Sequence, residues 1–369
     1  MYLSLNTEEL FNCLEVVEKA LPVRTTMPLT GNILCVISED KITFSATNHE
    51  IFIKATMNHS GSENGRILLP PKFVEVIRYF PTKDVEINID WDKHRIDMQG
   101  GSANFHLYGA DPDEYPLFFE ERITDSENYS MEKSLFKNTL RSVVFAASME
   151  ETRPAFNGVL FSFSDKTFTL TASDTYRLVV KDIVNQNWSF PDKSILVPAK
   201  ALKELMRIIG DSNNEIYFFY TGNVLSFRFD NTLFSTRLLE EKYPDVRGVI
   251  PADYKTRIEL DRKDLEDTVS RAALLAEGKN QAVNFSVISN NLEVRVNSQD
   301  GSMEEILSAV KEGEDLSLYI NTRFILDILK VLSEEKIIID FHGEGGPLIF
   351  RVPDNSGFLY LVLPIKKVN

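Results

Sequence analysis

The sequence predicts an α+β protein made of three copies of one domain, each with two helices packed on antiparallel sheets. Two observations predict this class. The same order of helix, hairpin, strand with helix, and closing strands recurs with a period of about 125 residues, close to a third of the 369-residue chain. Within each block, apolar residues follow helical spacing in the helix candidates, and short polar turns separate the strand candidates.

Each block opens with an amphipathic helix candidate. Its apolar residues recur at intervals of three and four, as Phe136, Leu140 and Val143 do. A helix with one apolar face needs a partner that covers this face, which favours packing on a sheet. The three segments are "LFNCLEVVEKAL" from Leu10, "LFKNTLRSVVFAAS" from Leu135 and "LEDTVSRAALLAE" from Leu265.

A segment with the pattern of β-strands follows each helix candidate. The polar breaks "SED", "SDK" and "SNN" divide it into two runs, which predicts a hairpin in every block. The hairpins begin near Gly31, Phe156 and Ala282. A strand and a second helix come next, and more strands close each block; these second units begin near Gly65, Lys193 and Leu316. The predicted domains are residues 1–122, 128–250 and 253–369, with joints near residues 120–128 and 250–255.

The composition predicts a globular protein of the cytoplasm. Hydrophobic residues make up 43% of the chain and charged residues 26%, as in ordinary soluble domains. Cys13 and Cys35 are the only cysteines, which argues against a disulfide framework or a thiolate zinc site and favours a reducing compartment. No apolar run approaches the roughly 18 residues that span a bilayer. The first residues, "MYLSLNTEEL", lack the features of a secretion signal.

Basic residues recur on the polar faces of the helix candidates. Lys133, Lys137 and Arg141 lie four residues apart, so they share one face opposite the apolar stripe. With a net charge of −15, the chain as a whole should not attract nucleic acid. A local basic surface would still favour duplex DNA through its phosphates, without reading sequence. Such a surface could also use Arg24, Lys72, Arg78, Lys200, Lys203 and Arg207. The alternative is that these residues only solvate the helices.

No catalytic constellation is present in the sequence. The five histidines lack metal-site spacing, the glycine-rich "GEGGP" at 343–347 lacks the GK[ST] of a phosphate loop, and no GxSxG occurs. We therefore expect no catalytic residue, metal or cofactor. An enzyme built on Asp174, Tyr176 and Arg177 is one alternative, but it would need a small-molecule cleft and a second catalytic group. A triplicated protein-binding scaffold without DNA encirclement is the other.

One stretch, "SDTYRL" from Ser173, differs from its counterparts in the other two blocks. These read "TNHEIF" in the first block and "NSQDGS" in the third, and neither has a basic residue followed by leucine. In a repeat protein, a feature that only one copy has is a candidate for function. The stretch is therefore a candidate site at the end of a strand.

Six motifs, taken in order, resemble those of the bacterial β sliding clamp, the processivity subunit of DNA polymerase III. The resemblance runs from the first helix to the C-terminus, and the length and three domains agree with it. The motifs are "RPAFNGVLF", "TASDTYRLVV", "ILVPAKALKELMRII", "KYPDVRGVIP", "RAALLAEGK" and "YLVLPI".

The resemblance implies the DNA clamp fold and a non-catalytic subunit of the polymerase III holoenzyme. Two chains would join head to tail in a six-domain ring, whose helices line a hole around double-stranded DNA. The implied partners are the polymerase III alpha subunit, the clamp loader, other DNA polymerases and mismatch-repair proteins. They would bind through short peptide motifs of the Gln-Leu-x-Leu-Phe type.

The resemblance also implies three sets of residues. The peptide pocket would comprise Phe156, Ser173, Thr175, Tyr176, Arg177, Leu178, Pro244, Val249, Leu361, Leu363, Pro364 and Ile365. The DNA-facing residues would be Arg24, Lys72, Arg78, Lys137, Arg141, Lys200, Lys203 and Arg207. At the ring joint, Phe105 and Leu107 would meet Leu274 and Leu275 of the next chain, with Arg95 near Glu304 and Glu305. Thr175 and Tyr176 stand in place of a common Gly-His pair, and Gly248 replaces a common basic residue, which predicts a less cationic pocket.

Overall fold

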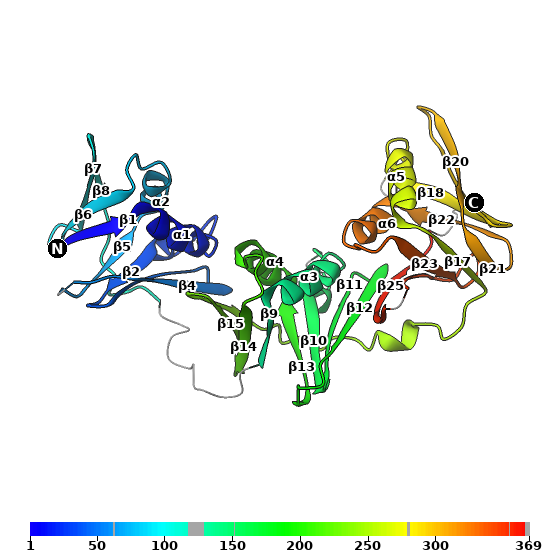
Figure 1. Cartoon of the computed structure of the whole chain (residues 1–369), viewed down its shortest axis with the longest axis horizontal. Coiled ribbons are helices and arrows are strands. Elements are labelled where there is room, and N and C mark those ends of the chain that lie inside the picture. The colour runs from blue at the N-terminus through cyan, green and yellow to red at the C-terminus, as the bar shows by residue number, and fades with distance from the viewer. Residues whose placement is uncertain (62, 117–128, 151, 279–280, 354, 366–369) are drawn as a thin grey trace. The chain divides into compact units, whose positions relative to one another are not determined.

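The structure is a computed structural model that describes residues 1–61, 63–116, 129–150, 152–278, 281–353 and 355–365 (Figure 1). The predicted joint at 120–128 and the last four residues therefore lie wholly outside the described residues. The chain forms two compact units. The first contains Met1–Lys137 and Lys203–Leu238, and the second contains Asn138–Leu202 and Leu239–Asn369.

Two antiparallel sheets make up the first unit. The smaller has the strand order β1 (Tyr2–Asn6), β6 (Asp84–Asp90), β7 (Arg95–Gly100) and β8 (Ala103–Tyr108). The larger has the order β5 (Gly65–Leu69), β2 (Ile33–Ile37), β3 (Lys41–Thr47), β4 (Ile51–Asn58), β16 (Thr232–Arg237), β15 (Val224–Phe229), β14 (Glu215–Thr221) and β9 (Tyr129–Glu132). Because β4 pairs with β16, this sheet joins strands of the first and second predicted domains.

Helices α1 (Thr7–Glu18) and α2 (Pro71–Arg78) pack against each other, and α1 also packs on β3 and β4. The Asn6 side chain starts α1 by accepting hydrogen bonds from the backbone N–H groups of Glu8 and Glu9, at 3.1 and 3.0 Å. The proline at the first position of α2 has no N–H to leave unpaired and is already set for a helix. The predicted apolar stripe is confirmed in α1, where Leu10, Leu14 and Val17 are buried.

Two further antiparallel sheets make up the second unit. The larger has the order β13 (Phe190–Pro198), β10 (Gly158–Asp165), β11 (Thr167–Ser173), β12 (Arg177–Val184), β25 (Asn355–Val362), β24 (Leu348–Val352), β23 (Lys336–Phe341), β17 (Thr256–Asp261) and β21 (Val310–Gly313). The smaller has the order β20 (Ser302–Ser308), β19 (Asn291–Asn297), β18 (Ala282–Ile288) and β22 (Leu316–Asn321). The pairing of β12 with β25 joins the second and third predicted domains.

The remaining helices follow the same plan. In the second unit α5 (Arg262–Ala273) packs against α6 (Thr322–Leu329), and the side chains of Asp261 and Asn321 cap their N-termini. Helices α3 (Lys133–Val144) and α4 (Ala199–Ile208) each have residues in both units. Short 3₁₀ turns lie at Pro28–Gly31, Pro154–Asn157 and Arg247–Val249.

The threefold repeat is confirmed by the order of these elements. Each block runs strand, helix, four strands, helix and three strands, so that β1, β9 and β17 occupy equivalent places. The third block has one strand more than the other two. This extra strand, β21, is short, lies between β20 and β22 in the sequence, and is separated from β20 by Ala309. The α+β class with two helices per domain on antiparallel sheets is therefore confirmed.

Candidate peptide pocket and nucleic-acid interface

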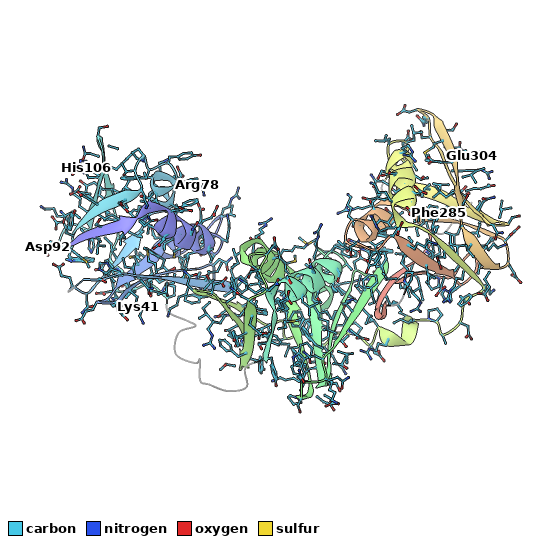
Figure 2. All side chains as sticks on the ribbon, in the orientation of Figure 1. Lys41, Arg78, Asp92, His106, Phe285 and Glu304 are labelled. Carbon is cyan, nitrogen blue, oxygen red and sulfur yellow. The ribbon has the colours of Figure 1, made fainter. Side chains whose placement is uncertain are left out.

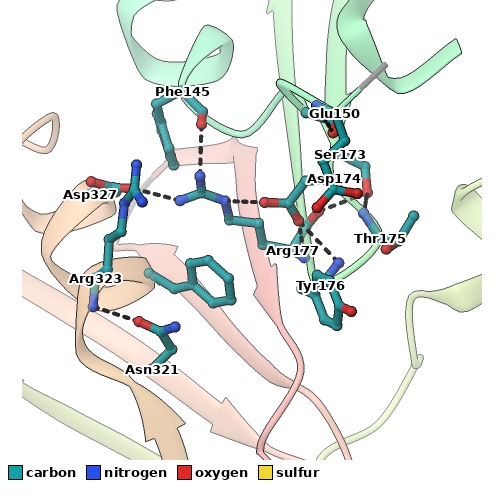
Figure 3. A network of polar contacts seen from close by, with 12 residues as sticks. Phe145, Glu150, Ser173, Asp174, Thr175, Tyr176, Arg177, Asn321, Arg323 and Asp327 are labelled. Carbon is teal, nitrogen blue, oxygen red and sulfur yellow. Dashed lines mark hydrogen bonds and ion pairs between the residues drawn. The ribbon is translucent and has the colours of Figure 1, made fainter. Parts of the chain in front are cut away.

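The stretch "SDTYR" forms the turn between β11 and β12 (Figure 3). Ser173 Oγ donates to the Arg177 carbonyl at 2.7 Å and accepts from the Thr175 N–H at 3.1 Å. Asp174 Oδ1 accepts from the N–H groups of Tyr176 and Arg177, both at 3.0 Å. Thr175 has a φ of +78°, in the left-handed region that β-branched residues rarely adopt. Side chains within the turn thus hold an unfavourable backbone conformation in place.

An apolar cluster lies beside this turn. Leu178 and Val180 of β12 are buried together with Ile349 of β24 and Leu361 of β25. The strand register explains the cluster, because Leu178 pairs with Leu361, which in turn pairs with Ile349. Three partly buried residues pack against it: Val246, Ile250 and Leu359.

Exposed apolar side chains belong to each of the three segments around this cluster. Tyr176 in the turn is 62% exposed, Val249 is 59% exposed, and Leu363 just after β25 is 41% exposed. The backbone N–H of Leu363 donates to the Tyr176 carbonyl at 2.9 Å, which holds the chain end against the turn. A buried apolar floor with an exposed apolar rim is suited to accept large side chains of a peptide.

The other predicted pocket residues have varied positions. Phe156 is half-buried and its ring meets the ring of Tyr243 edge-on, with centroids 5.7 Å apart, next to the exposed Pro244. Pro364 and Ile365 are half-buried, and the N–H of Ile365 donates to the Tyr319 carbonyl at 2.7 Å. The structure therefore brings residues from four distant parts of the second unit toward one region.

The Arg177 side chain lies on the other side of the sheet from the cluster. Successive residues of a strand point to opposite faces, so Arg177 and Leu178 diverge. The Arg177 side chain is only 7% exposed, and its guanidinium donates hydrogen bonds to Asp174 Oδ2 at 2.9 Å, Asp327 Oδ2 at 2.6 Å and the Phe145 carbonyl at 2.9 Å (Figure 3). Arg177 thus supports the pocket strand from behind.

Burial and charge oppose each other at Arg177. Burial works to lower the pKa of this guanidinium, but neighbouring Tyr360 and the carboxylates of Asp327 and Asp174 outweigh it and raise the pKa above its ordinary value. Burial raises the pKa of Tyr360 in turn, so its hydroxyl stays protonated and donates to the Phe324 carbonyl at 3.0 Å. The group is a permanently charged buried cation.

Sequence reasoning missed five apolar members of the cluster region. These are Val180, Ile349, Val246, Ile250 and Leu359, which lie in the cluster or pack against it. Alternation within "RLVV" could have assigned Val180 to the same face as Leu178. No signal in the sequence shows that β24 lies next to β25 with Ile349 opposite Leu361.

Most of the predicted DNA-facing residues are exposed, and several already have acidic partners. The exposed set is Arg24, Lys72, Arg78, Arg141, Lys200 and Arg207; Lys137 and Lys203 are half-buried. The ion pairs are Lys72–Glu75 at 2.6 Å, Arg78–Glu18 at 3.1 Å, Lys137–Asp211 at 2.8 Å and Arg207–Glu204 at 2.8 Å. Within the described residues, Arg24 and Arg141 have no ion pair. Acids beside the basic residues weaken the pull of each one on phosphate.

Lys133 is a correction to the predicted basic face. The sequence placed it in water with Lys137 and Arg141, but its side chain is only 2% exposed. Its ammonium Nζ lies 2.5 Å from Asp230 Oδ2, at the start of α3. Helical spacing puts Lys133 on the face of Lys137, but the first residue of the helix lies against the β15–β16 turn, which supplies a carboxylate.

Four of the residues predicted for the ring joint lie on sheet edges, Phe105 and Leu107 on β8 and Glu304 and Glu305 on β20, whereas Arg95 lies on the inner strand β7 and Leu274 and Leu275 follow α5. Strand β8 is an outer strand of one sheet and β20 an outer strand of another, and Figure 2 labels His106 on the first and Glu304 on the second. On β8, Phe105 is 36% exposed and Leu107 half-buried. After α5, Leu274 is 84% exposed and Leu275 half-buried.

The charged residues of this set have partners inside the chain. Arg95 Nε contacts Asp97 Oδ1 at 2.7 Å. Glu304 contacts Arg295 at 3.1 Å, and Glu305 contacts Arg271 Nε at 2.9 Å. Any pairing of Arg95 with Glu304 or Glu305 of another chain would add to these contacts or replace them.

No helix in the described part of the chain is long and apolar enough to cross a membrane. The same part of the chain has no group of three or more His, Cys, Asp or Glu side chains that could hold a metal ion.

Comparison with known proteins gives the family. Three family models match: DNA polymerase III beta subunit, N-terminal domain, over residues 1–119, its central domain over 130–245, and its C-terminal domain over 247–366. A beta sliding clamp from Staphylococcus epidermidis is 30% identical over 99% of both chains. The chain belongs to the bacterial beta sliding clamp family. It is a sliding clamp, a non-catalytic processivity subunit of DNA polymerase III.

Solved structures agree with this clamp in fold over their whole length. The DNA polymerase sliding clamp of Bacillus subtilis is 30% identical, with a TM-score of 0.94, and covers 100% of this chain and 99% of its own. A putative DNA polymerase III beta subunit from Eubacterium rectale is 26% identical, also with a TM-score of 0.94 and full coverage of both chains. As a clamp, the protein works with DNA and a polymerase and forms dimers.

Proposed function

We propose that this clamp closes head to tail as a dimer of six domains around duplex DNA in the cytoplasm, and holds partners through the pocket beside the "SDTYR" turn. Within each chain we place the domains at residues 1–122, 128–250 and 253–369. The proposed partners are the polymerase III alpha subunit, the clamp loader, other DNA polymerases and mismatch-repair proteins. Each would present a short peptide with apolar anchors.

The observation that carries the pocket is the apolar cluster with its exposed rim. Leu178 and Leu361 form a buried floor, and Tyr176, Val249 and Leu363 leave apolar surface in water at its edge. Large apolar side chains of a peptide gain most free energy where they fill such a site and exclude water. Leucine and phenylalanine anchors of a Gln-Leu-x-Leu-Phe motif have this chemistry.

Position 248 adds no charge to the rim near Val249, although its neighbour Arg247 is exposed. Gly248 has open space where a side chain would project, so no charged group occupies that position. Arg177 is enclosed by protein atoms and offers its charge to Asp174 and Asp327. Peptide recognition at this pocket should therefore depend on apolar contacts and backbone hydrogen bonds more than on ion pairs.

The sheet edges support the proposed ring joint. An outer strand leaves backbone N–H and C=O groups unpaired, and a second chain can pair with them. Strand β8 carries Phe105 and Leu107 at such an edge, and β20 offers another, near the strongly exposed Leu274. Pairing of unlike edges is heterologous, and it closes after two copies if the rotation is right.

Two basic residues, Arg24 in the loop after α1 and Arg141 on α3, support weak, sequence-independent DNA contact. Arg24 and Arg141 are exposed and lack an ion pair within the described residues, so they are the most available for phosphates. Contacts with phosphate release counterions and do not read the bases. A ring that encloses DNA needs only such weak contacts, since it is held by its closed form.

The pocket is tested by binding of a fluorescein-labelled peptide, Gln-Leu-Ser-Leu-Phe, measured by fluorescence anisotropy. Leu363→Ala should weaken binding about tenfold, because it removes an apolar rim group that the peptide would cover. Ile288→Ala is the matched control: Ile288 is 40% exposed and Leu363 41%, but Ile288 lies at the far end of β18. Equal binding by both variants would contradict the pocket assignment.

A further inference from the structure

We propose that Asp327 of α6 is a positioning residue for peptide binding, although it lies behind the pocket. The inference rests on the proposed pocket and names a residue outside it. Asp327 acts through Arg177: its Oδ2 accepts from Arg177 Nη1 at 2.6 Å, and the Asp327 side chain is 26% exposed (Figure 3).

The Arg177 guanidinium is fixed from several sides. The Phe145 carbonyl, just beyond the end of α3, accepts from Nη2 at 2.9 Å. The ring centroids of Phe324 and Phe145 lie 4.7 and 5.4 Å from the guanidinium carbon, within the range of cation–π attraction. With Asp327 and Asp174 at the remaining positions, one orientation of the side chain satisfies all partners at once.

Asp174 passes this constraint to the rim of the pocket. Its Oδ2 accepts from Arg177 Nε at 2.9 Å, and its Oδ1 accepts from the N–H of Tyr176 and of Arg177. The turn needs such support because Thr175 sits at a φ of +78°. Tyr176 then presents its exposed ring and uses its carbonyl to hold Leu363.

Asp327 on α6 therefore acts on the rim of the pocket through Arg177 and Asp174. When Asp327 loses its charge, Arg177 keeps Asp174, the Phe145 carbonyl and the two rings, but it loses its charged partner on α6. The turn is then free to relax toward a less strained backbone, which moves Tyr176 and Leu363. Peptide affinity should fall without any change in a residue that the peptide touches.

The test compares Asp327→Asn with Arg323→Gln by anisotropy of the same labelled peptide. Arg323 is the matched control because its Nε lies 4.0 Å from the same Asp327 carboxylate oxygen, but its side chain is 72% exposed and does not contact the turn. We expect Asp327→Asn to weaken the peptide about fivefold and Arg323→Gln to stay within about twofold. Asp327→Glu, which keeps the charge, should recover most of the affinity.

A second readout separates positioning from a general loss of structure. Amide hydrogen exchange at Tyr176 and Arg177, whose N–H groups are bound by Asp174, should speed up in Asp327→Asn and not in Arg323→Gln. If Asp327→Asn does not fold, Phe324→Leu is used in its place, because it removes the Phe324 ring that contacts the Arg177 guanidinium. Peptide affinity and amide exchange of this variant then test whether the position of Arg177 controls the turn. If folded Asp327→Asn has the peptide affinity and the exchange rates of the wild-type protein, the inference about Asp327 is wrong and the pocket assignment still stands. A wild-type protein that does not bind the peptide would overturn the pocket as well.

Discussion

Thr175 stores strain at the edge of the pocket. A β-branched residue at a φ of +78° costs about 1–2 kcal/mol, and asparagine tolerates this region better. We predict that Thr175→Asn raises the free energy of unfolding by about 1 kcal/mol, measured by urea denaturation. Thr175→Val keeps the branched side chain and should show no gain. A variant with asparagine that is less stable than wild type would mean that the surrounding turn has already relieved the strain.

Lys133 and Asp230 form a second informative pair. Burial works to raise the pKa of Asp230, but hydrogen bonds from Lys133 and Asn214 outweigh it and hold the pKa below its ordinary value of 3.8. A depressed carboxyl pKa stabilises the fold above the unfolded value, and this stabilisation is lost as the pH falls through the folded pKa. The carboxylate therefore matters most at neutral pH.

We predict that Asp230→Asn lowers the free energy of unfolding by about 2 kcal/mol at pH 7, because it leaves the buried Lys133 ammonium without a counter-charge. This figure is below the full cost of an unpaired buried charge, because the Asp230 side chain is 45% exposed and water screens its interaction with Lys133. The difference from wild type should disappear as the pH falls below the folded pKa, where wild-type Asp230 is neutral too. Asp211→Asn, at an 84% exposed partner of Lys137, should change stability by less than about 0.5 kcal/mol.

At the scale of elements, the first predicted domain contains a packing defect. A cavity of about 20 Å³ lies between the sheets and the helices α1 and α2, with walls that include Leu5, Cys35 and Phe73. Its lining is entirely apolar. Burial raises the pKa of the Cys35 thiol to about 12, so the thiol stays neutral and behaves as a small apolar group.

Filling this cavity should stabilise the protein. We predict that Cys35→Val, which replaces the sulfur by two methyl groups, raises the free energy of unfolding by about 0.5–1 kcal/mol in thermal or urea melts. Cys13→Val is the control, since Cys13 is equally buried but lies outside the cavity lining and contacts the Asn231 amide at 3.5 Å. It should gain nothing, and equal gains in both variants would argue that cavity volume is not the cause.

Local patterns predicted the elements but not their neighbours. Apolar residues at helical spacing fixed α1, α3 and α5, and polar breaks fixed the hairpins, because both signals act between residues close in the chain. The pairing of Leu178 with Leu361 joins strands far apart in the sequence and depends on tertiary packing. The same limit applies to Lys133, whose solvent-facing assignment was wrong because its partner Asp230 comes from a distant turn.

At the pocket, the family resemblance named residues that local patterns could not. It pointed to the turn, to Pro244 and to the chain end together, although these segments meet only in the folded second unit. It did not indicate which way each side chain points. Arg177 illustrates this, because strand alternation turns its guanidinium toward α6 and away from Leu178.

At the scale of the whole molecule, the proposed ring predicts a dimer whose joint covers apolar side chains, among them Leu274. Leu274→Asp places a charge on a side chain that is 84% exposed in the single chain and would be covered in the ring. We expect light scattering to give a mass near 42.1 kDa in place of twice this value, and retention on nicked circular DNA to be lost. Val310→Asp, at a 70% exposed residue of β21, should leave the dimer intact. A dimeric Leu274→Asp protein would place the joint elsewhere.

The pairings β4–β16 and β12–β25 also have a mechanical meaning. Each joins two successive domains of one chain by five matched residue pairs, Thr232–Ala55 to Thr236–Ile51 and Arg177–Val362 to Lys181–Phe358. A load along these strands shears their hydrogen bonds all at once instead of peeling them one by one. The two domain joints inside a chain should therefore be rigid under force and should not act as hinges. In the proposed ring, a clamp loader that pulls on the two chains would then separate them at the joint between the chains.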